Sequence, residues 1–479
     1  MEKILTNKTK IVATIGPACE EKEVLKEMIL NGMNVARLNF SHGAHEYMQK
    51  IINTIRELNE ELGCHVAMLA DLQGPKLRIG DIENGEVLLH PNDEIIFTAE
   101  NIIGNAHRVY MSYTDFPKDV NPGEKILIDD GKLIFEVIET DKKSQVKAKV
   151  LHGGYLRSKK GVNLPNTKIS LPCLTEKDRA DLEFILENEI SWIGLSFVRS
   201  ASDIIELKEI IKQHNKSCRV VAKIEKPEAI EDIDYIIKET DAVMVARGDL
   251  GVEIPMEKVP LIQKEIVEKS RKASKPVIIA TQMMESMINN ITPTRAEVND
   301  VANAVTDGAD AVMLSGETSV GKYPVEVIKT MYKIVQEAET FHGLYYKEEK
   351  PDKKTSGDRY ITDSICYSAA RLAASVDAKA IITNTFSGYT AFKLAAQRPK
   401  ADVFVFTANH KILNMLSLIW GVKGFYYDKF VSTDHTIADI KYILKKNGYI
   451  NDGDYIINIA SMPISERGMS NMLKLSEVN

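Results

Sequence analysis

Two short segments near the middle of the chain carry residues whose types and spacing suit catalysis. One is A-K-I-E-K-P at Ala222–Pro227, and the other is V-A-R-G-D-L-G at Val245–Gly251. Both adjoin compact apolar runs typical of buried parallel strands, and about one helix of sequence separates them. A strand–helix–strand unit brings the ends of its strands to one edge of a sheet, so Lys223, Glu225 and Asp249 should meet there. Two carboxylates and a cation predict magnesium-assisted chemistry on a phosphate or carboxylate.

Each of these charged residues, taken alone, is better explained as a solvated residue at a strand end. The same arrangement, however, recurs along the chain. Apolar, strand-like runs occur at Ile11–Thr14, Val35–Leu38, Val66–Ala70, Trp192–Leu195, Arg219–Ala222, Ala242–Ala246, Pro276–Ala280 and Ala311–Leu314. Most are separated by segments with helical periodicity. Eight such units predict an α/β fold, a (β/α)8 TIM barrel, whose active site lies at the carboxyl ends of the strands.

Polar residues follow nearly every one of these runs. They are Arg37 and Asn39, Asp71, Ser196, Lys223 and Glu225, Arg247 and Asp249, Thr281, and Glu317. Surface charges without a function would not be expected to recur in phase with the strands. The sequence therefore predicts a single polar rim at one end of the barrel.

The composition is typical of a folded enzyme. The chain has 479 residues, 44% of them hydrophobic, which suggests about three domains at ~150 residues each. A net charge of −7 argues against nucleic acid as the main partner. No leader opens the chain and no apolar stretch approaches the ~20 residues needed to span a membrane. The five cysteines are scattered, which favours reduced thiols and a cytoplasmic location.

The barrel pattern is interrupted after its third strand. Short alternating segments separated by turns, among them Asp130-Gly131, predict an inserted β-rich lid over residues 74–165. The catalytic barrel would then occupy residues 1–73 and 166–345. Beyond a charged linker, alternating helices and strands predict a C-terminal α/β domain over residues 355–479 that binds an effector.

One loop of the C-terminal domain suits phosphate binding. The strand Ala380–Thr383 leads into T-F-S-G-Y-T, Thr385–Thr390, followed by a helix starting near Gly388. Hydroxyls and a glycine before a helix N-terminus can hold a phosphate through Thr385, Ser387, Gly388 and Thr390, although an ordinary helix cap would have the same sequence.

Taken together, these motifs resemble the pyruvate kinase family from one end of the chain to the other. The matching stretches are K-I-V-A-T-I-G-P, A-R-L-N-F-S-H-G, S-K-K-G-V-N-L-P, A-K-I-E, V-A-R-G-D-L-G-V-E-I-P, A-T-Q-M-M-E-S-M, P-T-R-A-E-V and M-L-S-G-E-T. The resemblance implies a cytoplasmic homotetramer that transfers the phosphoryl group of phosphoenolpyruvate to ADP, giving pyruvate and ATP in the final step of glycolysis. It also implies regulation by a phosphorylated effector, bound at the T-F-S-G-Y-T loop.

The resemblance also implies roles for individual residues. Glu225 and Asp249 would bind magnesium or manganese, and Lys223 would be the catalytic lysine. Arg37 would bind the phosphoryl group, and Thr281 would orient the carboxylate or relay a proton. The remaining contacts would be Ser196 and Gly248 to substrate and Asn39, His42, Arg78 and Lys160 to the nucleotide.

The sequence departs from the family pattern at a monovalent-cation site. Asn39, Ser41 and Asp71 match potassium ligands, but Leu72 stands where many members have a threonine and Lys76 where they have a glutamate. These substitutions suggest the bacterial-type, lysine-bearing subgroup, in which Lys76 replaces the ion and potassium is dispensable.

Other functions are less well supported by the sequence. A magnesium-dependent aldolase or a phosphoenolpyruvate-using synthase would share the carboxylate pair but would not need the lid. A non-catalytic metabolite sensor should lack Lys223 or a metal carboxylate. For the effector, fructose 1,6-bisphosphate, a sugar monophosphate and AMP stay open, and the segment Pro463–Gly468 shows no obvious second phosphate loop, which favours a monophosphate.

Overall fold

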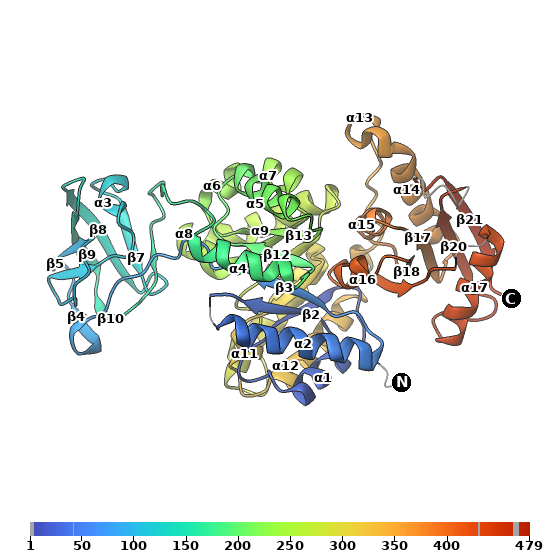
Figure 1. Ribbon diagram of the computed structural model, residues 1–479, viewed down its shortest axis with the longest axis horizontal. Helices are drawn as coiled ribbons and strands as arrows, with labels where there is room; N and C mark the ends of the chain where they lie inside the picture. The colour runs from blue at the N-terminus through green and yellow to red at the C-terminus, as the bar shows by residue number, and fades with distance from the viewer. Residues whose placement is uncertain (1–3, 42, 430–431, 463–468) are drawn as a thin grey trace.

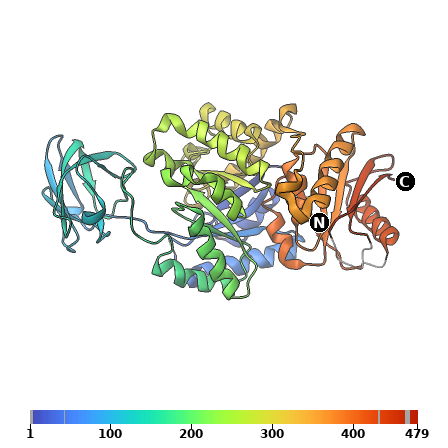
Figure 2. The same cartoon turned by 90° about the horizontal axis from the view of Figure 1, so that it is seen from above.

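The computed structural model describes residues 4–41, 43–429, 432–462 and 469–479. A β-rich part, a barrel surrounded by helices and an α/β part lie in a row (Figures 1 and 2). The β-rich part lies at one end of the row, although its sequence falls inside that of the barrel. The expected fold class is confirmed.

Eight parallel strands close the barrel in the spatial order β1-β16-β15-β14-β13-β12-β3-β2. They are β1 (Lys10–Thr14), β2 (Met33–Asn39), β3 (Ala67–Asp71), β12 (Trp192–Leu195), β13 (Arg219–Ile224), β14 (Ala242–Ala246), β15 (Val277–Ala280) and β16 (Ala311–Leu314). Every predicted strand is present, because continuous apolar runs can be buried on both faces of a parallel sheet.

Helices cover the outside of the barrel. The longer ones are α1 (Lys22–Leu30), α2 (His45–Leu62), α4 (Glu176–Glu187), α5 (Ala201–Gln213), α9 (Val259–Lys272), α10 (Arg295–Asp307) and α12 (Pro324–Ala338). The segment after β13 forms two short helices, α6 (Pro227–Glu231) and α7 (Ile233–Glu239). A short helix at the rim, α8 (Arg247–Glu253), begins directly at the end of β14.

The β-rich part has a hydrophobic core of its own. Its larger sheet has the order β11-β7-β8-β9-β5-β6, and a second sheet pairs β10 with β4. The strands are β4 (Glu86–Leu89), β5 (Glu94–Thr98), β6 (Arg108–Tyr110), β7 (Lys125–Ile128), β8 (Leu133–Thr140), β9 (Gln145–His152), β10 (Gly154–Arg157) and β11 (Val162–Asn163). Between β7 and β8 the chain turns at Asp130-Gly131, where both residues have positive φ, as the predicted hairpin requires.

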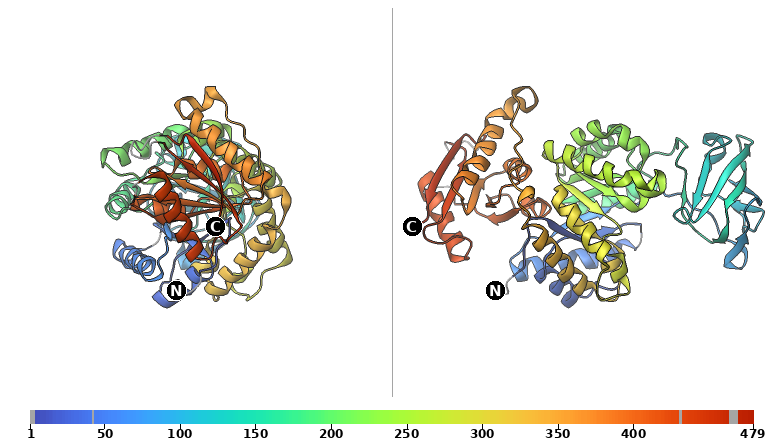
Figure 3. Two further views of the ribbon diagram at one scale, coloured as in Figure 1. Left: turned by 90° about the vertical axis from the view of Figure 1, so that its right-hand side faces the viewer. Right: turned by 180° about the vertical axis from the view of Figure 1, so that it is seen from behind.

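A five-stranded sheet of order β19-β18-β17-β20-β21 forms the C-terminal part (Figure 3). Its strands are β17 (Ala380–Asn384), β18 (Asp402–Thr407), β19 (Val422–Tyr426), β20 (Tyr455–Ala460) and the antiparallel edge strand β21 (Met472–Glu477). Its helices are α14 (Tyr360–Ser375), α15 (Tyr389–Ala396), α16 (His410–Leu416) and α17 (Thr433–Lys446). The five cysteines are unpaired. Among the helices that the structure describes, none is long and apolar enough to cross a membrane.

Buried charges join the amino ends of the barrel strands to the C-terminal part. Arg398 donates to both carboxylate oxygens of Asp310 at 3.1 and 3.0 Å, and the two side chains are 1% and 5% exposed. Asp310 also accepts the backbone N–H of Val277 at 3.0 Å. Nearby, the buried Lys10 donates to the carbonyl oxygen of Val422 at 3.0 Å. The carboxylate of Asp310 and both terminal nitrogens of Arg398 are therefore paired across this contact, whereas Arg398 Nε has no hydrogen-bond partner among the described residues.

Candidate active site

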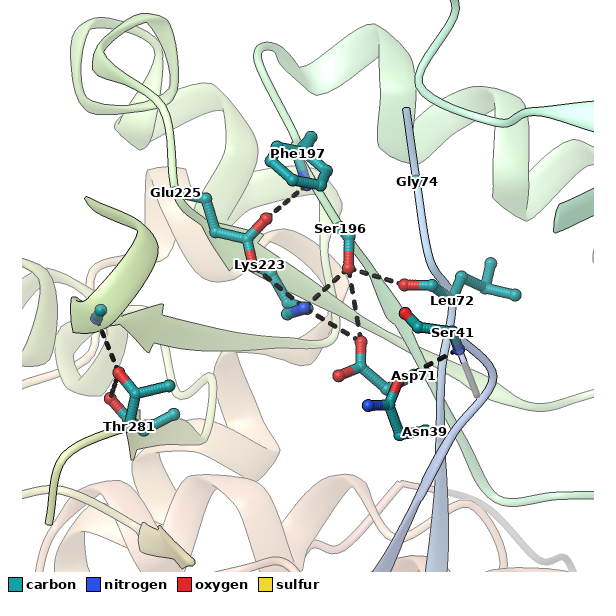
Figure 4. A network of polar contacts seen from close by, with 12 residues as sticks. Asn39, Ser41, Asp71, Leu72, Gly74, Ser196, Phe197, Lys223, Glu225 and Thr281 are labelled. Carbon is teal, nitrogen blue, oxygen red and sulfur yellow. Dashed lines mark hydrogen bonds and ion pairs between the residues drawn. The ribbon is translucent and has the colours of Figure 1, made fainter. Parts of the chain in front are cut away.

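Lys223 lies at the centre of a polar network at the carboxyl ends of the barrel strands (Figure 4). Its Nζ lies 2.7 Å from Ser196 Oγ, 3.1 Å from Asp71 Oδ1 and 2.9 Å from Glu225 Oε1. Ser196 Oγ also donates to the Leu72 carbonyl at 2.7 Å. The structure therefore brings together rim residues from β3, β12 and β13 that the sequence predicted to meet.

Arg37 completes this network from β2. Its Nε donates to Asp71 Oδ2 at 2.7 Å, its Nη2 contacts the same oxygen, and its Nη1 donates to Thr14 Oγ1 at 3.0 Å. Asp71 is 1% exposed, so its two oxygens are shared between two cations in a dry environment. The guanidinium is thereby fixed in orientation at the rim.

The charge pattern alters the acidity of the buried groups. Burial alone would raise the pKa of Asp71, but the charges of Lys223 and Arg37 outweigh it, so the pKa is lowered. Burial would lower the pKa of Lys223, but Asp71 and Glu225 raise it, so Lys223 stays protonated. Burial raises the pKa of Glu225, and the nearby charge of Asp249 adds to this despite the opposing effect of Lys223. Negative charge is therefore in excess on the Glu225 side.

Glu225 and Asp249 fit a hard divalent cation. Glu225 is 1% exposed, and its Oε2 accepts the backbone N–H of Phe197 at 2.8 Å. Asp249 lies in the first turn of α8, close enough to raise the pKa of Glu225. Within the described residues no cluster of three or more His, Cys, Asp or Glu could hold a metal. Two carboxylates suit magnesium, which commonly takes one or two from the protein and the rest from waters and substrate phosphates.

Thr281 adopts a backbone conformation that is rare for its residue type. Its φ is +70°, which is sterically unfavourable for a β-branched side chain. This geometry lets its Oγ1 accept the backbone N–H of Gly248 at 2.7 Å, at the start of α8. A Cβ at position 248 would lie 3.2 Å from that oxygen, so a side chain there would crowd the contact. Such strain is found preferentially at functional sites.

The predicted monovalent-cation residues are only partly brought together. Asn39 accepts the backbone N–H of Ser41 at 3.1 Å, and Asp71 is occupied by Arg37 and Lys223. The Leu72 side chain is buried in the hydrophobic core of the barrel. Lys76 is exposed and forms no ion pair with any described residue; it lines a hollow beside Asp249.

This hollow lies between the β-rich part and the rim. It is open to solvent and is lined by residues of both parts, including Lys76, Asp130, Asn163, Lys226, Asp249 and Glu253. Arg78 donates to the carbonyl oxygen of Lys159 at 2.9 Å, and Lys160 pairs with Asp129 at 2.8 Å. These two of the four predicted nucleotide contacts therefore lie in the β-rich part, outside the Lys223 network. Of the other two, Asn39 is the last residue of β2 and His42 lies outside the described residues.

Two further rim residues, Arg247 and Glu317, hold neighbouring loops in place. Arg247 pairs with Asp300 at 2.7 Å and donates to the Thr281 carbonyl oxygen at 2.8 Å. Glu317, 2% exposed, accepts the backbone N–H groups of Met284 and Ser315 at 3.2 and 2.7 Å. Both stabilise loops of the rim.

In the C-terminal part, α15 begins at Tyr389, one residue after the expected start. Gly388 has φ +81° and donates its N–H to Thr385 Oγ1 at 3.1 Å. Tyr389 N–H donates to Ser387 Oγ at 3.4 Å, whereas Thr390 is buried and its hydroxyl contacts Thr383. The segment Pro463–Gly468, named in the effector prediction, lies outside the described residues.

Sequence reasoning missed Lys226, Glu253 and Asn163, which form a hydrogen-bonded cluster beside the rim, with Lys226 and Glu253 buried and Asn163 half-buried. All three lie inside the quoted motifs. The spacing of Glu253, four residues after Asp249 on one helix, was a usable indication that both acids share a face.

The fold and the site define a (β/α)8 barrel with a buried network of charged residues at its rim. A family model described as pyruvate kinase, barrel domain, matches residues 6–328, and one described as pyruvate kinase, alpha/beta domain, matches residues 363–476. A pyruvate kinase of Geobacillus stearothermophilus is 42% identical over 99% of this chain and 81% of its own length. One of Bacillus licheniformis is 42% identical over 98% of this chain and 80% of its own length.

A solved structure gives the same answer. The crystal structure of a pyruvate kinase from Cryptosporidium parvum superposes with a TM-score of 0.91 at 35% identity, covering 99% of this chain and 96% of that one. The chain belongs to the pyruvate kinase family and is a phosphotransferase.

Proposed function

We propose that the chain transfers the phosphoryl group of phosphoenolpyruvate to ADP, giving pyruvate and ATP. The observation that supports this most is the buried Lys223 ammonium between the carboxylates of Asp71 and Glu225, at the rim of a barrel of this family. The step breaks the bond between phosphorus and the enol oxygen and forms a bond to a terminal phosphate oxygen of ADP. The enolate left behind takes up one proton at its methylene carbon.

The proposed roles follow from charge and position. Lys223 stabilises negative charge on the transferring phosphoryl group and the enolate, and Arg37 binds the phosphoryl oxygens. Gly248, at the start of α8, and Ser196 contact substrate, and Thr281 orients its carboxylate or relays the proton. Asn39, His42, Arg78 and Lys160 bind the nucleotide, the last two as the β-rich part closes over the rim.

The divalent cation would be held by Glu225 and Asp249. When bound, magnesium or manganese offsets negative charge on the carboxylate and phosphoryl oxygens of the substrate. Burial and, to a smaller extent, the negative charge of Asp249 raise the pKa of Glu225, and this proximity of two carboxylates supports the assignment.

The activity is tested by pyruvate formation from phosphoenolpyruvate and ADP, coupled to a dehydrogenase. We expect turnover in the parent and a higher manganese requirement in Glu225→Gln and Asp249→Asn. Absence of pyruvate formation would refute the function, and an unchanged manganese titration would refute the ligands.

We also propose that the enzyme belongs to the lysine-bearing subgroup and works without potassium. Leu72 offers no side-chain oxygen, and Arg37 and Lys223 already neutralise Asp71. Activity should be equal in tetramethylammonium buffer with and without potassium chloride at matched ionic strength, and Lys76→Glu should introduce a dependence. Strong activation of the parent by potassium would contradict the proposal.

For regulation, we propose that Thr385, Ser387, Gly388 and Thr390 bind a phosphorylated effector, a monophosphate in preference to a bisphosphate. The positive φ of Gly388 and the short loop before α15 support this. Activation by fructose 1,6-bisphosphate, a sugar monophosphate and AMP should be compared in the parent and in Ser387→Glu. Identical responses in both proteins would exclude the loop.

The assembly and domain division are proposed likewise. The catalytic barrel would span residues 1–73 and 166–345, the lid 74–165 and the effector domain 355–479, in a cytoplasmic homotetramer. Exposed apolar side chains on the barrel, such as Met256 at 75% and Leu261 at 71%, suit contacts between subunits. Light scattering of the purified protein tests the tetramer.

A further inference from the structure

A buried ion pair lies beside the Lys223 network but does not belong to it. Lys226 Nζ is 2.7 Å from Glu253 Oε1, and the two side chains are 7% and 1% exposed. Asn163 Nδ2, from the last strand of the β-rich part, donates to the same oxygen at 2.8 Å. Buried ion pairs contribute little to stability in general, so stability alone does not explain this pair. Its location in the structure offers another explanation.

The place of the pair in the chain suggests that explanation. Lys226 directly follows Glu225 at the end of β13. Glu253 ends α8 and lies four residues after Asp249, so both acids project from one face of the helix. That face meets the end of β13, where Asp249 approaches Glu225 and Glu253 contacts Lys226.

The two contacts differ in sign. Glu225 and Asp249 repel each other. Burial is the main reason why the pKa of Glu225 is raised, and this repulsion is a further one. Lys226, the residue after Glu225, and Glu253, one helical turn after Asp249, attract each other. At the start of α8, Thr281 Oγ1 accepts the Gly248 N–H at 2.7 Å. The helix is therefore fixed at both ends while its acidic side faces another acid.

We propose that Lys226 and Glu253 are positioning residues that set the separation of the Glu225 and Asp249 carboxylates, and through it the affinity for a divalent cation. This inference rests on the metal site proposed above. Asn163 connects the same carboxylate to the β-rich part. Glu253 Oε2 has no hydrogen-bond partner among the described residues, so the Glu253 carboxylate is held through Oε1 alone.

The test is a titration of the full-length, substrate-free protein with Mn²⁺. Electron paramagnetic resonance measures the free ion at each step. The variant Lys226→Met/Glu253→Gln removes both charges together, which avoids an unpaired buried charge. We expect Mn²⁺ to bind about 10–100-fold more weakly, the usual effect of losing a residue that orients metal ligands. Lys226→Arg keeps the charge and has room in the hollow, so its affinity should stay near that of the parent.

A matched control is Arg398→Met/Asp310→Asn, which removes a buried ion pair at the other end of the barrel and should leave Mn²⁺ binding unchanged. Binding within twofold of the parent in folded Lys226→Met/Glu253→Gln would overturn the inference. If that variant does not fold, Lys226→Gln, whose shorter and uncharged side chain breaks the ion pair with Glu253, takes its place under the same criterion. If Glu225→Gln and Asp249→Asn also bind Mn²⁺ normally, the proposed metal site itself is wrong.

Discussion

The two ends of the barrel use buried charge differently. At the amino ends of the strands, Arg398 and Asp310 form a bidentate ion pair, and Asp310 also accepts the backbone N–H of Val277. At the carboxyl ends, Lys223 is shared between Asp71 and Glu225, and Asp249 stands close to Glu225. Charges are balanced at the first end and left in excess at the second.

This difference separates a stabilising contact from a binding site. A balanced buried pair has its charges satisfied within the fold, so removing one partner alone leaves an unpaired buried charge and should lower stability. An unbalanced cluster has charge left over for a cation or an anionic ligand, so its loss should affect turnover and binding. Variants at each end can test this contrast.

The largest effect on stability is expected from Arg398→Met. It leaves Asp310 charged, buried and without its cation, which should lower the free energy of unfolding by about 3–5 kcal/mol. Urea unfolding measures this. Arg398→Met/Asp310→Asn should recover most of the loss, and a single variant as stable as the parent would contradict the contrast.

At the opposite end, Lys223→Met should mainly reduce turnover. Loss of one group that stabilises charge in the transition state typically lowers the rate by about 10²–10³-fold. Steady-state kinetics with phosphoenolpyruvate and ADP give the result, with circular dichroism to verify folding. A turnover within a few-fold of the parent would remove Lys223 from the proposed chemistry.

A smaller effect, visible only in pH dependence, is expected at Lys10. Burial lowers its pKa to about 8, with Glu339, Lys423, Lys8 and Asp402 as its charged neighbours. Between this value and the unfolded value near 10.5, the unfolded chain binds one more proton, so stability rises with pH.

Relative to Lys10→Met, the parent should therefore gain about 2 kcal/mol between pH 7 and pH 9.5. Urea unfolding of both proteins at the two pH values measures this difference. An equal difference at both pH values would contradict it.

The sequence predicted the barrel well because its strands are long apolar runs in a regular order. Small elements were missed: β11 has two residues, and β21 is an edge strand in which Lys474 and Glu477 interrupt the apolar pattern. Such elements form because a neighbouring strand pairs with them, which local periodicity does not reveal.

The sequence predicted which residues lie at the rim better than it predicted which of them contact each other. Rim residues were identified because each follows a strand, but strand order alone does not show that Arg37 contacts Asp71. The pair of Lys226 and Glu253 joins segments 27 residues apart, and its burial depends on how α8 packs. The role of Lys76 stays a prediction.

The β-rich part also bears on how the barrel forms. Arg78 and Gly161 form a bridge, and Ile79 N–H donates to the Lys160 carbonyl oxygen at 3.0 Å, so the two connections run side by side. If the insertion folds early on its own core, barrel strands β3 and β12 are joined by an effectively short loop. Shortening a flexible connection about tenfold saves about 2 kcal/mol of closure entropy. The insertion would then fold first, and the barrel, whose sequence flanks it on both sides, would fold afterwards.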